Sequence, residues 1–425
     1  MHSENRLGES ARASLRGEPY RLFFPLAIVI AFVGVGHWLA YAHGWSSTYS
    51  GLAHSQLQAG GYVGCFVLGF LMTALPRNAA APPASFAEVG IALAATIAQV
   101  IALSMGAWIP AIGAQLAIFV FIAYFAARRF RKARASAAPP VEFVWLPLGI
   151  AIGSAGCLLA ILGMLGLAPA WLQKAGLLMA QQGFVISVVL GVGGFLAPRL
   201  MGHRAAIVAR PGVSVAALAA ARRRRVVVHC AAAVALLASL LIEGAGAIRL
   251  AYLLRAAVVT AELAWTTRLF RRPAITDVYV KYLWMSLWSL TIGLWAVAIF
   301  PAWRVAMLHF VFVGGFSLMT FAIGTMVVLS HAGESSVLRG RLPALRVVGI
   351  ATAVALIVRL IAETQLDHYF AWLGAASTLW LLGAAVWIAY ITPRLLRVVP
   401  PAVFERAHEE AKSRILQSAT HSSGS

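Results

Sequence analysis

Long apolar runs separated by short polar stretches are the dominant pattern of this chain of 425 residues. Runs of roughly 18 or more apolar residues are long enough to cross a bilayer as helices. Inside lipid every backbone N–H and C=O needs a partner within the span, and the short alternating segments typical of barrel strands are absent. The pattern therefore predicts an all-α transmembrane bundle of about twelve spans. Their approximate limits are 22–43, 56–76, 86–106, 107–127, 143–167, 171–197, 226–242, 247–265, 279–300, 303–330, 345–363 and 369–391.

These spans define one predicted transmembrane domain, residues 22–391, between polar tails at residues 1–21 and 392–425. The third and fourth spans meet at a tight turn near Gly106. We find no convincing internal repeat in the sequence. The eighth span is the weakest, because it holds three charged residues, Arg249, Arg255 and Glu262.

The distribution of basic residues predicts how the chain is oriented. Of 34 Lys and Arg, 29 fall in the tails and loops of one side when the spans alternate. The positive-inside rule then places both termini in the cytoplasm. Topology and contact with anionic lipid explain the net charge of +20, so we predict a lipid bilayer as partner and no nucleic acid. Only 11% of the residues are charged, against about 25% in soluble domains, which excludes a soluble class.

The histidines fall at distinct depths in this topology. His54 lies at the outer mouth of the second span, and His309 lies about two turns in from the outer face of the tenth. His331 ends the tenth span 22 residues further on. At about 1.5 Å per residue this separation is roughly 33 Å, close to the thickness of the hydrocarbon layer. His309 and His331 therefore cannot share one metal ion. His229 and His203 lie towards the inner face.

A histidine at a helix end is most often an interfacial residue with a satisfied hydrogen bond. His309 differs, because an ionisable group inside a span is costly and usually faces the bundle interior. Neutral imidazole is also the commonest protein ligand of haem iron and copper. The sequence therefore indicates an outer site at His54 and His309. An inner site would combine His331 with His229 or His203.

Other polar side chains also interrupt the spans. We interpret the Arg/Glu sets among them as ion pairs that hold helices together; the alternative is an arginine that binds a propionate, or a proton path. The residues are Gln181 and Gln182 in the sixth span, Arg255 and Glu262 on one face of the eighth, and Arg359 and Glu363, an i, i+4 pair, in the eleventh.

Two stretches resemble segments of the NnrS family. GLAHSQLQAGGYVGCFVLGFLMTALPR (Gly51–Arg77) is similar to the segment in which that family carries histidines before a GFLLTA-P motif. LHFVFVGGFSLMTFAIGTMVVLSHAGE (Leu308–Glu334) is similar to its HALTVGAFG-M-x-T-R-x-x-LGHTG segment. The resemblance implies a polytopic inner-membrane protein of bacteria that contains haem b, allows copper as a second metal, and acts in nitric oxide metabolism and resistance to nitrosative stress.

The family's histidines carry over one at a time. His54 matches the first histidine of the H-x-H-E pattern, whereas Gln56 replaces the second and Leu57 the acid. His309 and His331 match the histidines that open and close the second motif. Thr325 matches the threonine of the family's T-R pair, and Met326 replaces the arginine. The resemblance thus implies cofactor binding by His54, His309 and His331, and we add His229 to these three as a metal ligand.

The leading functional hypothesis is therefore a haem protein whose metal is held by histidines between helices, with nitric oxide or a related small molecule as its ligand. The alternative is a secondary transporter or permease without a metal, because twelve spans with cytoplasmic termini is a common transporter layout. A purely structural partner is the third hypothesis. The sequence contains no P-loop, no HExxH motif and no nucleophile elbow, so catalytic residues are not identified and turnover of a substrate stays open beside simple binding.

Overall fold

A computed structural model of the protein describes residues 16–132, 139–203 and 214–397. All regular structure within these residues is helical. Eleven of the helices described are long and apolar enough to cross a membrane, which confirms a multi-pass membrane protein. A twelfth long helix covers the predicted eighth span and carries its three charged residues. The predicted polar tails lie largely outside the described residues.

The helices follow the predicted spans, and most extend a few residues beyond them. In chain order the α-helices are α2 (Tyr20–Ala42), α3 (Gly51–Gln56), α4 (Gly64–Asn78), α5 (Phe86–Ser104), α6 (Trp108–Arg131), α7 (Trp145–Met164), α8 (Ala170–Leu178), α9 (Phe184–Val188), α10 (Gly194–Leu200), α11 (Val215–Gly244), α12 (Ile248–Thr266), α13 (Val278–Ile299), α14 (Arg304–His309), α15 (Leu318–His331), α16 (Pro343–Thr364) and α17 (Tyr369–Leu395).

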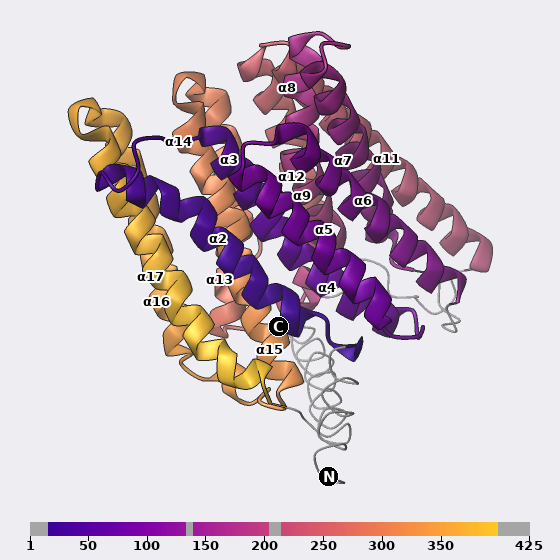
Figure 1. Cartoon of the computed structure of the whole chain (residues 1–425). Helices are drawn as coiled ribbons and strands as arrows, with labels where there is room; N and C mark the ends of the chain where they lie inside the picture. Colours follow the sequence, from indigo (N-terminus) through magenta and orange to yellow (C-terminus); the bar gives the residue numbers. More distant parts are fainter. Residues whose placement is uncertain (1–15, 133–138, 204–213, 398–425) are drawn as a thin grey trace. The chain divides into compact units, whose positions relative to one another are not determined.

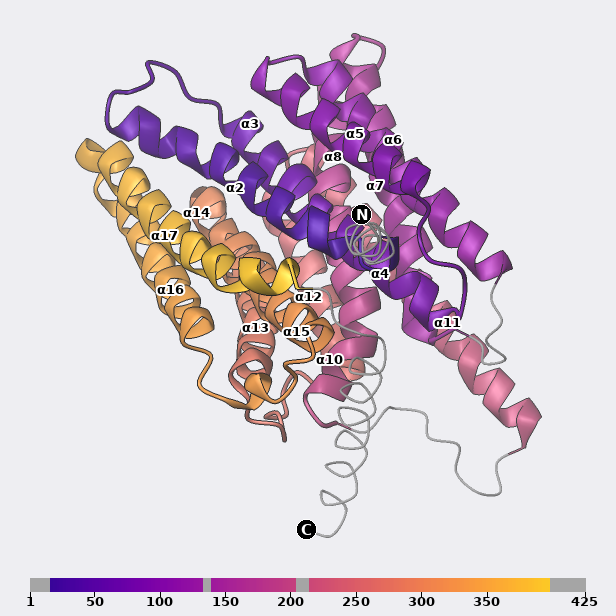
Figure 2. The same cartoon turned by 60° about the horizontal axis from the view of Figure 1, so that its bottom comes forward.

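The chain divides into two compact units, each described by itself. Unit 1 contains α2 to α6, the end of α15 from Gly324, and α16 and α17. In this unit α17 packs against both α16 and α2, and it runs beside α2 in both views (Figures 1 and 2). Unit 2 contains α7 to α14 and the start of α15 up to Ile323. In this unit α12 packs against α11 and α13.

Two hairpins turn on glycines with left-handed backbone conformation. Gly106, between α5 and α6, has φ of 69°, and Gly246, between α11 and α12, has φ of 99°. Such a φ carries little penalty for glycine, and it lets the following amide reach back to an unpaired helix carbonyl. Ala107 N donates to Ala102 O at 2.8 Å in this way. The predicted turn near Gly106 is confirmed, and the hairpin between α11 and α12 uses the same device.

The order of elements recurs three times along the chain. Each group has a first helix, a long second helix with π-helical turns, and then a pair of helices joined by a short turn. The first helix of each group packs against the second. The groups are α2 to α6, α7 to α12 and α13 to α17. Sequence comparison did not reveal this recurrence, because it lies in element order and helix length.

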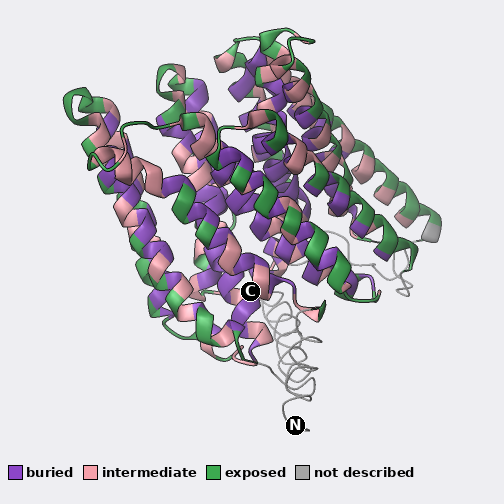
Figure 3. Cartoon of the chain, in the orientation of Figure 1, coloured by how far each residue is buried: buried purple, intermediate pink, exposed green. Residues whose placement is uncertain are grey.

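Four π-helical segments interrupt helices of the described chain. They are Leu57–Val63, Met179–Gly183, Val189–Gly193 and Phe310–Ser317. Single wide turns of this kind are frequent at functional sites, since they redirect side chains within a helix. Two of these segments begin just after His54 and His309. Buried residues run along the helices, and many loop residues are exposed (Figure 3).

Candidate functional site

The four predicted site residues lie in separate surroundings within each unit. In unit 1 His54 contacts His37 near the end of α2, whereas His331 stacks on Tyr20 at its start. The 17 residues between these two contact points span roughly 26 Å of helix. In unit 2 His229 lies in α11 and His309 ends α14. Within the described residues there is no group of three or more His, Cys, Asp or Glu arranged to hold a metal ion.

His229 is fully buried in unit 2 and is held by side chains from two other helices. Its Nδ1 lies 2.8 Å from Glu262 Oε2 of α12 and 3.2 Å from Trp145 Nε1 of α7. The ring of Trp265 lies alongside, with centroids 5.1 Å apart. His229 Nε2 is also buried and has no hydrogen-bond partner among the described residues. An imidazole with one nitrogen held and the other unpartnered is the arrangement that a metal ligand requires.

The shorter contact assigns the proton of this imidazole. A carboxylate oxygen accepts hydrogen bonds only, so at 2.8 Å from Glu262 the Nδ1 atom of His229 carries a proton and donates it. The indole N–H of Trp145 is also a donor, so with this proton in place its 3.2 Å approach to Nδ1 is a packing contact and not a second hydrogen bond. The lone pair of the neutral ring is then on Nε2. Glu262 also fixes the rotation of the ring, which is the role of an outer-shell carboxylate in many metal sites.

His54 and His37 share one backbone acceptor in unit 1. His54 Nδ1 lies 2.8 Å and His37 Nδ1 2.9 Å from the carbonyl oxygen of Gly34. A carbonyl oxygen only accepts, so both Nδ1 atoms are donors and each neutral ring keeps its lone pair on Nε2. The ring centroids are 5.8 Å apart. The shared carbonyl thus fixes the tautomer of both rings.

Aromatic side chains cover the outer end of unit 1 around His54. Trp38 meets the His54 ring edge-on at 5.8 Å and stacks on Phe370 at 6.5 Å. Phe370 in turn contacts Tyr41 at 4.7 Å and Tyr49 at 5.0 Å. This cluster joins the end of α2 to the start of α17. It provides flat apolar walls beside an imidazole, which suit a flat aromatic ligand.

The remaining candidate histidines differ in what their nitrogens contact. His309 Nδ1 donates to Val305 O at 2.7 Å, so His309 has the same proton arrangement as His54. His331 Nε2 accepts from Arg77, and a metal at this nitrogen would have to displace that guanidinium. His203 has carbonyl oxygens near both nitrogens, those of Thr267 and Arg272, each at 3.2 Å. His203 is thus a helix-end residue in unit 2.

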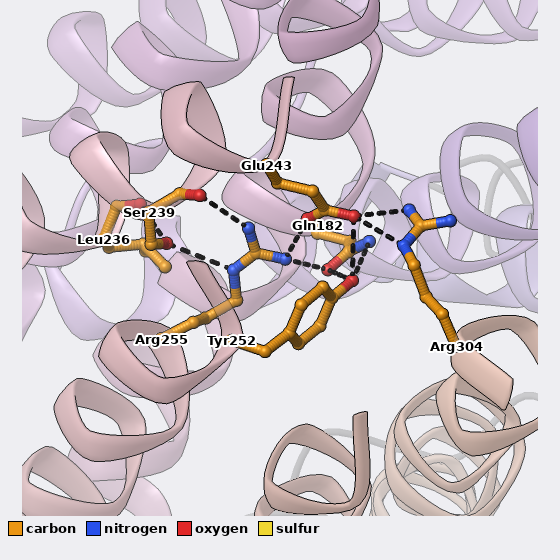
Figure 4. A network of polar contacts seen from close by, with 7 residues as sticks. All are labelled: Gln182, Leu236, Ser239, Glu243, Tyr252, Arg255 and Arg304. Carbon is orange, nitrogen blue, oxygen red and sulfur yellow. Dashed lines mark hydrogen bonds and ion pairs between the residues drawn. The ribbon is translucent and has the colours of Figure 1, made fainter. Parts of the chain in front are cut away.

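The second polar site of unit 2 is a buried network around Arg255 (Figure 4). Arg255 donates through Nε to Ser239 Oγ at 3.1 Å, through Nη1 to Gln182 Oε1 at 2.6 Å, and through Nη2 to Ser239 O at 3.2 Å. Its Nη1 also lies 2.8 Å from Glu243 Oε2. Tyr252 donates to Glu243 Oε1 at 3.1 Å. In Figure 4 Arg304 approaches Glu243 from the opposite side, at 2.5 Å.

These contacts correct one reading of the sequence and confirm another. Arg255 and Glu262 share a helix face but do not pair, because Arg255 is held by Glu243 and Glu262 by His229. The i, i+4 pair is formed, with Arg359 Nη2 2.9 Å from Glu363 Oε1. Sequence reasoning missed Glu243, which lies at the end of α11 where its partners come from other helices.

Two further residues of unit 1 were missed as members of a site. Sequence spacing does not link His37 to His54, which the structure brings together. Gln56 was seen only as a replaced histidine, yet it is fully buried and its amide has no hydrogen-bond partner among the described residues. The available signal was that Gln56 is a polar residue at the position of a family histidine.

Comparison with known proteins bears on the whole chain. No curated protein matches it. The family model described as NnrS protein matches residues 14–398, nearly the full length and including both histidine motifs. The chain therefore belongs to the NnrS family.

Proposed function

We propose that this protein holds haem b within the bacterial inner membrane through buried histidines and binds nitric oxide there, as part of nitric oxide metabolism and resistance to nitrosative stress. Family membership supports the proposal. The observation that carries it is the buried Nε2 of His229, which has no partner among the described residues while Nδ1 is held by Glu262.

The residues present fit such a cofactor at two places. His229 offers a lone pair in a dry setting between Trp145 and Trp265, where an unpaired polar atom would otherwise be costly. His54 offers a lone pair beside the aromatic cluster of unit 1. When bound, ferrous haem would supply the site that takes nitric oxide.

The chain's own residues set the conditions at these positions. Glu262 keeps the proton of His229 on Nδ1 and makes the imidazole a stronger donor, as carboxylate partners do in metal sites. Gly34 O orients His54 without adding charge. A charged partner stabilises the higher oxidation state of a bound metal more than a carbonyl does, so the two positions differ in redox character. Copper is the second metal that neutral imidazole accommodates.

The test is the absorption spectrum of the full chain in detergent, reduced, with and without nitric oxide. We expect a Soret band that shifts with nitric oxide. His54→Ala and His229→Ala each remove the haem of one position and so lower the haem content by about half, and the double variant lowers it by about tenfold or more. His43→Ala is the matched control, since His43 is an exposed histidine that only stacks on Trp45. Metal analysis of the same samples measures copper.

A colourless wild type, expressed with ample haem, would overturn the proposal and leave the transporter hypothesis, to be followed by transport assays. Full haem content in both histidine variants would keep haem but move its ligands to His309 and His331.

A further inference from the structure

Arg359 is a buried cation whose hydrogen bonds are mostly unmade. It lies on α16 near the outer end of unit 1, and 4% of its surface is exposed. Only Nη2 has partners: Glu363 Oε1 at 2.9 Å and the Tyr369 hydroxyl at 3.3 Å. Nε and Nη1 are buried and have no partner among the described residues. These two atoms carry three N–H protons.

Arg359 lies at the same end of unit 1 as His54. Its guanidinium is 5.6 Å from the ring centre of Tyr369, whose neighbour Phe370 belongs to the aromatic cluster that contacts His54 through Trp38. A charged group, an imidazole with an available lone pair and aromatic walls are thus assembled within one unit.

Buried N–H groups without acceptors are costly, and those of a charged group most of all. The acceptor that best matches a guanidinium is a planar oxyanion such as a carboxylate. Glu363 already offsets the charge of Arg359, but its side chain is partly exposed and touches only Nη2. The unmet donors therefore call for a second acceptor from outside the chain.

We propose that Arg359 binds a carboxylate of the ligand whose metal His54 holds, that is, a haem propionate. The inference rests on the proposed function and adds an orientation: the haem lies with one propionate edge towards α16. Arg359 acts as a binding residue, and Tyr369 positions its guanidinium.

The sharpest test leaves Arg359 unchanged and compares two ligands. Haem-free full-length protein, purified from haem-deficient cells, is titrated with haem and with haem dimethyl ester, which lacks both carboxylates. We expect the wild type to bind haem about ten to a hundred times more tightly than the ester, in line with the strength of charged hydrogen bonds. His229→Ala is titrated in parallel, so that only the His54 position is observed.

Arg359→Gln then tests whether this residue makes the difference. We expect its preference for haem over the ester to fall close to unity, and that of Arg359→Lys to fall between the two. Arg249→Gln is the control, because Arg249 is an exposed arginine in the first turn of α12. It keeps the wild-type preference.

The outcomes separate the two proposals. Haem binding with equal affinity for the ester in the wild type, or a preference unchanged in Arg359→Gln, overturns this inference and leaves the proposed function standing. Where Arg359→Gln does not fold, the wild-type comparison alone decides. A protein that takes up neither compound overturns both.

Discussion

Arg255 and Arg359 are two buried arginines of the same chain with opposite surroundings. Each has a glutamate within 2.9 Å and a tyrosine ring beneath its guanidinium. All three nitrogens of Arg255 donate to oxygens of unit 2. In unit 1 only one nitrogen of Arg359 has a partner among the described residues. The two sites therefore differ in how many donors are satisfied.

Net charge alone would predict the opposite: that the network around Arg255, and not Arg359, needs a further anion. The network of unit 2 has two guanidiniums, Arg255 and Arg304, against the single carboxylate of Glu243, whereas Arg359 and Glu363 balance. The donors of Arg255 are nevertheless bonded, since Gln182 and Ser239 accept from it, and Tyr252 donates to Glu243. A network in which every nitrogen of the arginine donates a hydrogen bond fixes helices, whereas an arginine with unbonded nitrogens leaves donors for a ligand.

The largest expected effect is on stability when the shared carboxylate is removed from the closed network. Glu243→Gln leaves the fully buried guanidinium of Arg255 and the partly exposed one of Arg304 without a counter-ion, which costs about 3–5 kcal/mol of unfolding free energy. Glu363→Gln makes the same chemical change at the open site, where the carboxylate is partly exposed, and costs about 1 kcal/mol. Thermal unfolding of both haem-free variants in one detergent measures the difference.

Equal losses of stability in these two variants would contradict the comparison. They would mean that burial of the arginine, and not the completeness of its bonds, sets the cost of losing a glutamate.

The next effect should differ in sign between the sites. Arg255→Met removes the central donor of the network and leaves Gln182 Oε1 without its guanidinium partner. We expect the free energy of unfolding to fall by about 2–3 kcal/mol. Arg359→Met exchanges three unmet N–H protons for an apolar chain of similar length. Glu363 loses its partner, but its carboxylate is partly exposed and can be hydrated, so that loss costs about 1 kcal/mol or less. Removal of the unmet buried N–H groups offsets it. We therefore expect haem-free Arg359→Met to unfold at the wild-type temperature or above it.

The same variant separates stability from function. Arg359→Met should bind haem more weakly while it unfolds no earlier, which is the usual trade-off at a site kept for a ligand. A marked destabilisation of haem-free Arg359→Met would show that Arg359 belongs to the structure and would remove it from the ligand site.

The fold was largely predictable because helix length and apolar runs follow directly from the thickness of a bilayer. The weakness of the eighth span was also predicted: Arg249, Arg255 and Glu262 lower its hydropathy, and α12 alone among the long helices described falls short of the criteria for a span. The pair Arg359 and Glu363 was predicted from i, i+4 spacing, which places two side chains on one face of any helix.

The sites were less predictable because their contacts join different helices. The side chains around His229 come from α7 and α12, and the partners of Arg255 come from α11 and from the π-helical segment Met179–Gly183. Spacing within one helix says nothing about such contacts. It even suggested a false pair, since Arg255 and Glu262 share a face yet each is drawn to a closer partner on α11. The family motifs identified histidines but not the groups that hold them.

The smallest expected effect concerns the two tyrosines. Tyr252→Phe removes a fully buried hydroxyl that donates to Glu243 at 3.1 Å and receives from Gln182 at 3.4 Å, so it should cost about 1–2 kcal/mol in thermal unfolding. Tyr369 is a partly buried residue whose hydroxyl accepts from Arg359 at 3.3 Å, so Tyr369→Phe should cost less than about 0.5 kcal/mol. Because Tyr369 positions Arg359, its loss should instead lower the preference for haem over the dimethyl ester a few-fold.

A large loss of stability in Tyr369→Phe with an unchanged preference would show that the open site is held together as tightly as the closed one, and the contrast between the two arginines would then fail.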